Sequence, residues 1–441
     1  MTSNVTRRQM LQGLAIAGGG MLLGRQAASA ARDLPPSEKL SLAFIGSGGQ
    51  AEFSLENLAD HNIVALCDVD ENRAAEAFRR NPQAKRYTDY RKMLDDMHRQ
   101  IDAVVVCTPD HTHAPAAIRA MRLGKHVYCE KPLTWCIAEA RLMAETAKSQ
   151  KVATQMGTQG MALAGARAGI EVLRDGVLGP VSQIHVWTDR AKGWWPQGVA
   201  RPRETPSVPP GLDWDLWLGV APQRPYHPQY APFQWRGRLD FGTGAIGDMG
   251  IHNAAMVYVG LQLGLPKSIE VVGSSGITDD SYPEWSLLRL EFAGRNGQPP
   301  ITMHWYDGGK KPSSELIGGR EVAANGAIVV GDKGTMYSIE WTGADWHLLP
   351  EEKFRDYKPP DPTIRRTTGH HAEWIEACKG GPPPLCNFAD LAAPLTEVML
   401  LGNLALRVGR KVEWDADSMK ATNCPEADRY IRREYRRGWE I

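Results

Sequence analysis

The amino-acid sequence predicts an α/β protein whose first half folds around a doubly wound parallel sheet. Three observations predict this fold: short apolar runs alternate with helically spaced stretches, a glycine-rich turn follows the first of these runs, and 441 residues are more than one hydrophobic core usually organises. A chain of this length is expected to form two domains, and the alternation places the parallel sheet in the first of them.

The first half contains five apolar runs rich in β-branched residues, and these are the expected strands: 40–46, 62–68, 101–109, 126–132 and 151–157. They are too unbroken to be half exposed, so they fit a sheet that is covered on both faces. The stretches between them have the spacing of helices, and they are 51–59, 71–80, 90–97, 115–123 and 137–148.

The first expected strand runs into the turn GSGGQA, which begins at Gly46. Gly46 allows a tight turn, Gly48 lets the backbone approach a pyrophosphate, and Ala51 replaces a third glycine where helix meets strand. The phosphates would lie on the helix N-terminus, where free N–H groups favour an anion. Gly46, Gly48 and Gly49 are therefore candidate residues for binding a dinucleotide.

Asp68 ends the second expected strand, 20 residues after Gly48. A carboxylate at this position binds the hydroxyls of the adenosine ribose and repels a 2′-phosphate, which favours NAD over NADP. The alternative is that Asp68 or Asp70 only starts the next helix as its N-cap.

Two further stretches, TPDHTHAPAAIRAMRLGKHVYCEKPLT (108–134) and GDMGIHNAAM (247–256), carry a resemblance to a known family. Together with the glycine turn they resemble the glucose–fructose oxidoreductase and inositol dehydrogenase family, Gfo/Idh/MocA. The resemblance implies an N-terminal Rossmann domain, a C-terminal α/β domain with an open, mostly antiparallel sheet, and a homo-oligomer. Most members move hydride between NAD(P) and a sugar, cyclitol or related polyol.

The expected organisation has five parts in chain order. They are a signal peptide at 1–30, a linker at 31–39, an NAD-binding domain at 40–157, a substrate and oligomerisation domain with returning helices at 158–415, and a C-terminal tail at 416–441. The basic tail interleaves acidic residues, so it is interpreted as a solvated surface element.

The resemblance also implies site residues. Lys131 matches the active-site lysine of the EKP motif, at the nicotinamide end of the cofactor. The residues that fall where the family lines the dinucleotide are Thr108, His113, Glu130 and Lys131 itself. Asp248 and His252 match an Asp-x-x-x-His pair of inositol dehydrogenase-like members.

The chemistry of that pair also makes sense without the resemblance. A separation of four residues puts Asp248 and His252 on one face of a helix, one turn apart. A neutral imidazole can take the hydroxyl proton as hydride leaves, and the carboxylate can fix its tautomer. Lys131 could polarise the same oxygen. The competing interpretation is that Asp248 is an N-cap and His252 a satisfied core histidine.

Substrate contacts are expected from three places. Thr158 and Gln159 stand where cyclitol dehydrogenases carry an Arg-rich segment. Residues 185–305 hold eight tryptophans, and Trp194 and Trp195 are the best candidates to face a sugar ring from an exposed loop. The alternative is that the tryptophans pack a loop-rich edge. Tyr306 lies two residues after His304 in an expected strand, so both share one face, which is expected to be the face turned to the cofactor.

The N-terminal residues have the pattern of a signal peptide for export. Arg7 and Arg8 precede an apolar run at 14–23 and the small-x-small pattern at 28–30, which suggests a twin-arginine signal cut before Ala31. The alternative, a membrane anchor, is disfavoured because the run has about half the roughly 20 residues that a span needs. A periplasmic or otherwise exported enzyme has no cofactor pool, so its NAD is expected to be tightly bound and recycled.

Composition excludes several other classes. Without residues 1–30 the chain has 48 basic and 51 acidic residues, a net charge of −3, so nucleic acid is not an expected partner. His111, His113 and the pair His370-His371 lack companions at ligand spacing, so no metal is expected. Seven cysteines show no framework, although a Cys378–Cys386 bridge is left open.

The leading hypothesis is an exported NAD-dependent oxidoreductase acting on a sugar, glycoside or polyol, with the export machinery and a carbohydrate as its partners and no integral membrane span. Two alternatives stay open. One is a redox-neutral glycoside hydrolase like the NAD-dependent α-N-acetylgalactosaminidases, and the other is a non-catalytic carbohydrate-binding relative.

Overall fold

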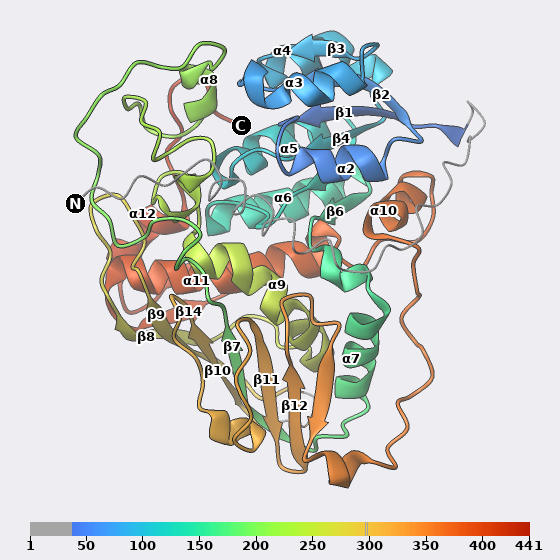
Figure 1. Cartoon of the computed structure of the whole chain (residues 1–441), viewed down its shortest axis with the longest axis vertical. Coiled ribbons are helices and arrows are strands. Elements are labelled where there is room, and N and C mark those ends of the chain that lie inside the picture. Colours follow the sequence, from blue (N-terminus) through green and yellow to red (C-terminus); the bar gives the residue numbers. More distant parts are fainter. Residues whose placement is uncertain (1–37, 296, 298) are drawn as a thin grey trace.

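The N-terminal half forms a six-stranded parallel sheet (Figure 1). The computed structural model describes residues 38–295, 297 and 299–441, so the expected signal peptide and most of the linker lie outside the described residues. The strand order is β3-β2-β1-β4-β5-β6. In chain order the strands are β1 (Ser41–Ile45), β2 (Asn62–Cys67), β3 (Lys85–Tyr87), β4 (Ala103–Val106), β5 (His126–Cys129) and β6 (Thr154–Met156).

Helices cover both faces of this sheet, which is the doubly wound arrangement expected from the sequence. They are α2 (Ala51–Asn57), α3 (Glu71–Arg80), α4 (Tyr90–Met97), α5 (His113–Arg122) and α6 (Ile137–Gln150). Helices α4, α5 and α6 pack on one face, and α2 and α3 pack on the other. Strand β3 was not predicted, because its three residues are polar and largely exposed at the sheet edge.

A helix from far along the chain completes the second face. Helix α10 (His370–Cys378) places Trp374 and Ile375 in the same apolar cluster as Phe44 and Val105. Trp374 is fully buried there. The core of the N-terminal domain therefore includes side chains more than 200 residues away in sequence.

The second sheet has nine strands in the order β13-β12-β11-β7-β10-β9-β8-β14-β15. The β7–β10 pair is parallel and the other pairs are antiparallel. The strands are β7 (Val181–Trp187), β8 (Ser268–Ser274), β9 (Ser286–Phe292), β10 (Ile301–Tyr306), β11 (Gly326–Gly331), β12 (Gly334–Ser338), β13 (Trp346–Leu349), β14 (Val412–Asp415) and β15 (Lys420–Ala421). The predicted fold class, a Rossmann sheet plus a mostly antiparallel α/β domain, is confirmed.

Three helices lie on the face of this sheet that is turned toward the first domain: α7 (Ala164–Arg174), α9 (Gly244–Leu261) and α11 (Ala393–Val408). Helix α11 also packs against α6, as expected for a returning helix (Figure 1). It is buried on nearly all sides instead of being amphipathic, because it lies between the two domains. Within the described residues, Phe388–Val408 is the one helix with the length and apolarity of a membrane span, and 83% of its most apolar window is buried, as in a core helix.

The segment between β7 and α9 is long and has its own small core. Trp214, Trp217 and Trp235 pack there with Tyr230 and Phe241, around the short helix α8 (Trp214–Leu218). These tryptophans therefore pack a loop-rich region, which is the alternative interpretation of their abundance.

The C-terminal tail differs from the sequence expectation, which placed it in solvent. After α12 (Asp428–Ile431), the Tyr435 hydroxyl donates to Glu139 at 2.6 Å and the guanidinium of Arg91 lies 3.8 Å from the ring centre of Trp439. The tail packs against the first domain because its aromatic residues contact side chains there. All seven cysteines are free in the described chain, so Cys378 and Cys386 are not bridged.

Candidate active site

The predicted cofactor residues gather at one edge of the parallel sheet. Because all six strands run in the same direction, their carboxyl ends meet there, and the segments that follow β1, β2, β4, β5 and β6 carry the predicted residues. The switch in strand order falls between β1 and β4, which is where dinucleotides bind in such sheets.

The glycine turn is held by the carboxylate of Asp68. Its Oδ2 accepts hydrogen bonds from the backbone N–H of Ser47 at 2.7 Å and of Gly48 at 3.1 Å. Gly46 has a φ of +82°, and a Cβ there would come 2.8 Å from the carbonyl carbon of Cys107, so only glycine fits. The N-cap of α3 is Asp70 and not Asp68, which leaves Asp68 for the turn.

Two buried hydroxyls at this edge have no hydrogen-bond partner, those of Thr108 after β4 and Thr158 after β6. An unsatisfied buried hydroxyl costs about 1–3 kcal/mol, so a ligand that bonds to it is favoured. With the free helix terminus at the glycine turn, these groups suit a polar, phosphate-bearing dinucleotide.

That His113 lines the dinucleotide stays a prediction, and in the structure its ring lies between two backbone oxygens. Its ring nitrogens lie 2.8 Å from the carbonyl oxygens of Pro132 and Thr108. Burial lowers the pKa of His113 to about 4, so the ring is neutral at pH 7 and donates to one of the two carbonyls. Its role here is to hold together the loops after β4 and β5.

The side chains of Glu130 and Gln159 are hydrogen-bonded to each other. The Gln159 amide donates to Glu130 Oε1 and lies within reach of the Tyr128 hydroxyl, both at 3.2 Å. A Cβ on Gly157 would overlap the Glu130 carboxylate, so this glycine makes the arrangement possible. Burial raises the pKa of Glu130 to about 7. Gln159 was expected to offer its amide to substrate, and in the structure Glu130 takes that hydrogen bond.

The two domains meet at an ion pair between Lys131 and Asp248. Lys131 Nζ lies 2.8 Å from Asp248 Oδ1 and 3.2 Å from the backbone oxygen of the same residue. Arg236 Nε lies 3.6 Å from the same Oδ1. Burial acts to raise the pKa of Asp248, but Lys131 and Arg236 outweigh it and hold the pKa below its usual value.

His252 lies one turn after Asp248 in α9, as the spacing predicts. Its Nδ1 is buried without a hydrogen-bond partner, and its ring meets Trp341 edge-on at 4.9 Å. Burial and the Lys131 charge lower the pKa of His252 well below its usual value. The expectation that Asp248 fixes the tautomer of His252 is not met, because the carboxylate is turned to Lys131.

Three charged residues at the site were not predicted. Asp110 is buried, and its Oδ2 accepts a 2.7 Å hydrogen bond from Thr243, just before α9. Burial raises the pKa of Asp110 to about 7. The other two are Arg190 and Arg236, from the segment between β7 and α9. Asp110 stands inside the 108–134 stretch, but no spacing rule singles out any of the three.

The predicted substrate residues of the second domain are mostly engaged elsewhere. Trp195 is only 6% exposed and donates to Gln197, so the loop is not open as expected. Trp194 is half buried beneath the guanidinium of Arg190. Tyr306 does share a face with His304, but this face is the one turned away from α9 and α11, where the Tyr306 hydroxyl contacts His185 at 2.9 Å.

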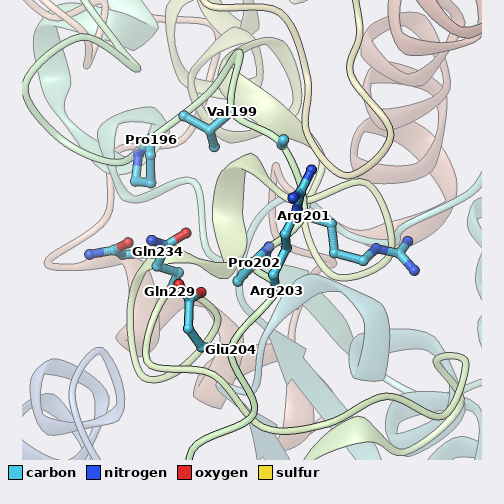
Figure 2. Close-up of a pocket in the computed structure, with 9 residues that line it drawn as sticks. Pro196, Val199, Arg201, Pro202, Arg203, Glu204, Gln229 and Gln234 are labelled. Atoms are coloured by element: carbon cyan, nitrogen blue, oxygen red, sulfur yellow. The ribbon is translucent and has the colours of Figure 1, made fainter.

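A cavity of about 570 Å³ lies in the segment between β7 and α9, beside Pro196, Arg203 and Gln229 (Figure 2). Gln234 lines it and belongs to the same turn, Gln234–Gly237, that carries Arg236. Neither Lys131 nor the Asp-x-x-x-His pair is among the lining residues. Across the described residues, no group of three or more His, Cys, Asp or Glu side chains is placed to hold a metal ion.

Comparisons with known proteins agree with this geometry. Residues 40–158 match the family model GFO_IDH_MocA, described as "Oxidoreductase family, NAD-binding Rossmann fold", and residues 170–296 match its companion, "Oxidoreductase family, C-terminal alpha/beta domain". Together the two models span more than half of the chain.

Individual relatives are named dehydrogenases. A myo-inositol 2-dehydrogenase of Thermotoga maritima is 33% identical over 116 residues, which is 26% of this chain and 34% of that protein. A D-xylose 1-dehydrogenase (NADP(+)) of Hypocrea jecorina is 35% identical over 128 residues, 26% of this chain and 32% of that protein. The chain thus spans about a third of the length of these curated relatives.

The likeness to solved structures is broader but concerns the fold alone. The WlbA dehydrogenase of Bordetella pertussis, in complex with NADH and UDP-GlcNAcA, superposes with a TM-score of 0.59 over 86% of this chain and 100% of that chain, at 17% identity.

Proposed function

Because the chain belongs to the Gfo/Idh/MocA oxidoreductase family, we propose that it transfers a hydride between NAD and a hydroxyl-bearing carbon of a sugar, glycoside or polyol. The observation that carries the proposal is the Lys131–Asp248 ion pair with a neutral His252 one turn further along α9, all at the carboxyl edge of the dinucleotide-binding sheet. When bound, the nicotinamide supplies the hydride acceptor.

In this proposal the chain's own groups handle the proton. The substrate C–H bond breaks as a hydride, and the hydroxyl proton moves to the imidazole of His252. The ring is neutral in the free protein because burial and Lys131 lower its pKa, while the Asp248 charge acts in the opposite direction and favours the protonated form. Lys131 donates a hydrogen bond to the same substrate oxygen and orients it.

The preference for NAD and its tight retention are also part of the proposal. Asp68 would face the ribose hydroxyls and repel a 2′-phosphate. His371 on α10 contacts the Ser54 hydroxyl on α2 at 2.9 Å. A helix from the second half of the chain therefore packs against α2, the helix whose N-terminus would bind the pyrophosphate. Export by the twin-arginine route is consistent with a cofactor that is loaded before export and not exchanged. Assembly as a homo-oligomer belongs to the same proposal.

Mass spectrometry and absorbance of the purified protein test this function. We expect a stoichiometric dinucleotide whose absorbance at 340 nm changes when the right sugar or glycoside is added. Release of free sugar without a net absorbance change would instead indicate the redox-neutral hydrolase. The variant His252→Ala should retain the dinucleotide and lose its reduction, by about 10²–10⁴-fold. Reduction at the normal rate in that variant would remove His252 as the base.

A further inference from the structure

The site around His252 holds more positive than negative charge. Lys131, Arg190 and Arg236 are the cations that act on Asp248 or His252, and Asp248 is the carboxylate that they share. Asp110 adds only about half a negative charge at pH 7, because burial raises its pKa to about 7. A bound oxidised nicotinamide adds one more positive charge.

Arg236 is rigidly presented to this site. Its guanidinium lies 4.3 Å from the ring centres of both Phe233 and Trp235, and one amino group donates to the backbone oxygen of Phe233 at 3.1 Å. The Nε edge faces Asp248, and the side chain keeps 22% of its surface exposed. A guanidinium fixed in this way loses little entropy when it binds a ligand.

Arg190 approaches from the end of β7. Its guanidinium lies over the ring of Trp194 at 3.3 Å and forms an ion pair with the neighbouring Asp189, which is 38% exposed. Arg190 itself is only 15% exposed, and burial lowers its pKa although Asp189 and Asp248 act to raise it. A negative ligand group would complete its environment.

This arrangement differs from a structural ion network elsewhere in the same segment. Arg224 and Arg238 both donate to Asp280, at 2.8 Å each, and all three side chains are nearly inaccessible. Those arginines are closed to ligands. By contrast, Arg190 and Arg236 remain partly open beside the groups that the proposed reaction uses.

We propose that the substrate is an acidic sugar, whose carboxylate is held by Arg190 and Arg236 while Lys131 and His252 act on its hydroxyl. Guanidinium groups bind carboxylates through paired N–H donors, which would fix both the position and the register of the sugar ring. Counting Asp189 against Arg190, about half a charge on Asp110 and the positive charge of the bound nicotinamide leaves an excess of between one and two positive charges, which favours an anionic substrate group such as a carboxylate. This inference rests on the proposed function for the hydroxyl chemistry.

The test uses the purified holoenzyme and matched pairs of sugars that differ only at one carbon. The pairs are D-glucuronate with D-glucose, D-galacturonate with D-galactose, and the methyl glycosides of each. Reduction of the bound cofactor is followed at 340 nm, and binding is measured separately by calorimetry. We expect at least one acid to exceed its neutral partner by tenfold or more in kcat/KM and in affinity, with an affinity that falls as salt rises.

Variants assign the preference to the two arginines. Arg190→Gln and Arg236→Gln should each lower the affinity for the acid by tenfold or more and reduce the preference for the acid over its neutral partner to within about twofold, and Arg236→Lys should recover part of that preference. Arg203→Gln is the matched control, because this exposed arginine lines the neighbouring cavity and contacts none of the site residues in the described structure. Thermal melting checks that each variant is folded.

The outcomes separate this inference from the proposed function. Neutral sugars that reduce the cofactor as well as the acids do would overturn the inference and keep the function. Acid binding that depends on Arg236 without any reduction would keep the acidic ligand and overturn the hydride chemistry. Acids that show no binding at all, or binding unchanged in both glutamine variants, would overturn the inference outright.

Discussion

Lys131 Nζ lies 2.8 Å from Asp248 Oδ1, and this ion pair joins the loop after β5 of the first sheet to a helix that covers the second sheet. Both side chains are mostly buried, so the pair is shielded from water and depends on both partners. The ammonium group that the proposed reaction uses is therefore positioned by a residue of the other domain.

Replacement of Asp248 should disturb this positioning. In Asp248→Asn the Lys131 charge loses its strongest partner, and we expect the rate of cofactor reduction to fall by about 10²-fold or more while the dinucleotide stays bound. Single-turnover absorbance at 340 nm measures the rate, and the exposed Asp345→Asn is the control. A rate within twofold of the unmodified protein would mean that the ion pair does not matter for the reaction.

The buried carboxyl of Glu130 should make stability depend on pH. Burial raises its pKa from 4.5 to about 7, so the folded protein binds this proton more tightly than the unfolded chain does. The stability from this group is therefore full below about pH 4.5 and declines as the pH rises through 7. In Glu130→Gln the decline should be smaller, by up to about 3 kcal/mol between these pH values.

Urea unfolding at a series of pH values measures this difference. Glu145→Gln, at an exposed glutamate, serves as the control and should follow the unmodified protein. Parallel pH profiles for Glu130→Gln and the unmodified protein would show that Glu130 ionises normally.

The contact between His371 and Ser54 should govern how long the cofactor is retained. In His371→Ala the hydrogen bond to α2 and the stacking on Tyr128 at 4.6 Å are both lost, so we expect faster loss of the dinucleotide and a destabilisation of about 1–3 kcal/mol. The ratio of absorbance at 260 and 280 nm after extended dialysis measures retention. His347→Ala, at an exposed histidine in β13, controls for loss of an imidazole. Equal retention of the dinucleotide in both variants would show that the contact of α10 with α2 does not affect cofactor binding.

Gly46 should be intolerant of any side chain. Gly46→Ala places a Cβ 2.8 Å from the Cys107 carbonyl carbon in addition to the strain of a φ of +82°. Gly124→Ala is a matched control, because Gly124 has a φ of +73° and no heavy atom within 4 Å of the added carbon. We expect about 1 kcal/mol of destabilisation for the control and clearly more for Gly46→Ala, together with loss of the cofactor. Equal melting temperatures for Gly46→Ala and Gly124→Ala would show that the close approach of Cys107 does not restrict the residue at position 46.

The sequence predicted the first domain well because its signals are local. Unbroken apolar runs mark strands that are covered on both faces, and the ranges of α3 and α4 were predicted to the residue, because Asp70 and Asp89 cap them. Strand β3 was not predicted, because an exposed edge strand of three polar residues has no apolar pattern.

The candidate site was predictable where one motif carries the chemistry and not where packing decides it. Lys131 and His252 stand in short recognisable stretches, and the structure brings them to the same edge. The direction of the Asp248 carboxylate, the burial of Trp195 and the approach of Arg190 all depend on how the segment of residues 188–243 folds over α9. The packing of the C-terminal tail on the first domain was not predicted for a similar reason. Its basic composition suggests a solvated segment, although Trp439 is buried.

The position of α10 has a consequence for biosynthesis. The second face of the first sheet stays open until Trp374 and Ile375 arrive, and these residues are made only after most of the chain has left the ribosome. The domain that would receive the dinucleotide is thus translated before the second domain but completed only after most of it, and a fragment that stops before residue 370 should expose an apolar surface that chaperones bind.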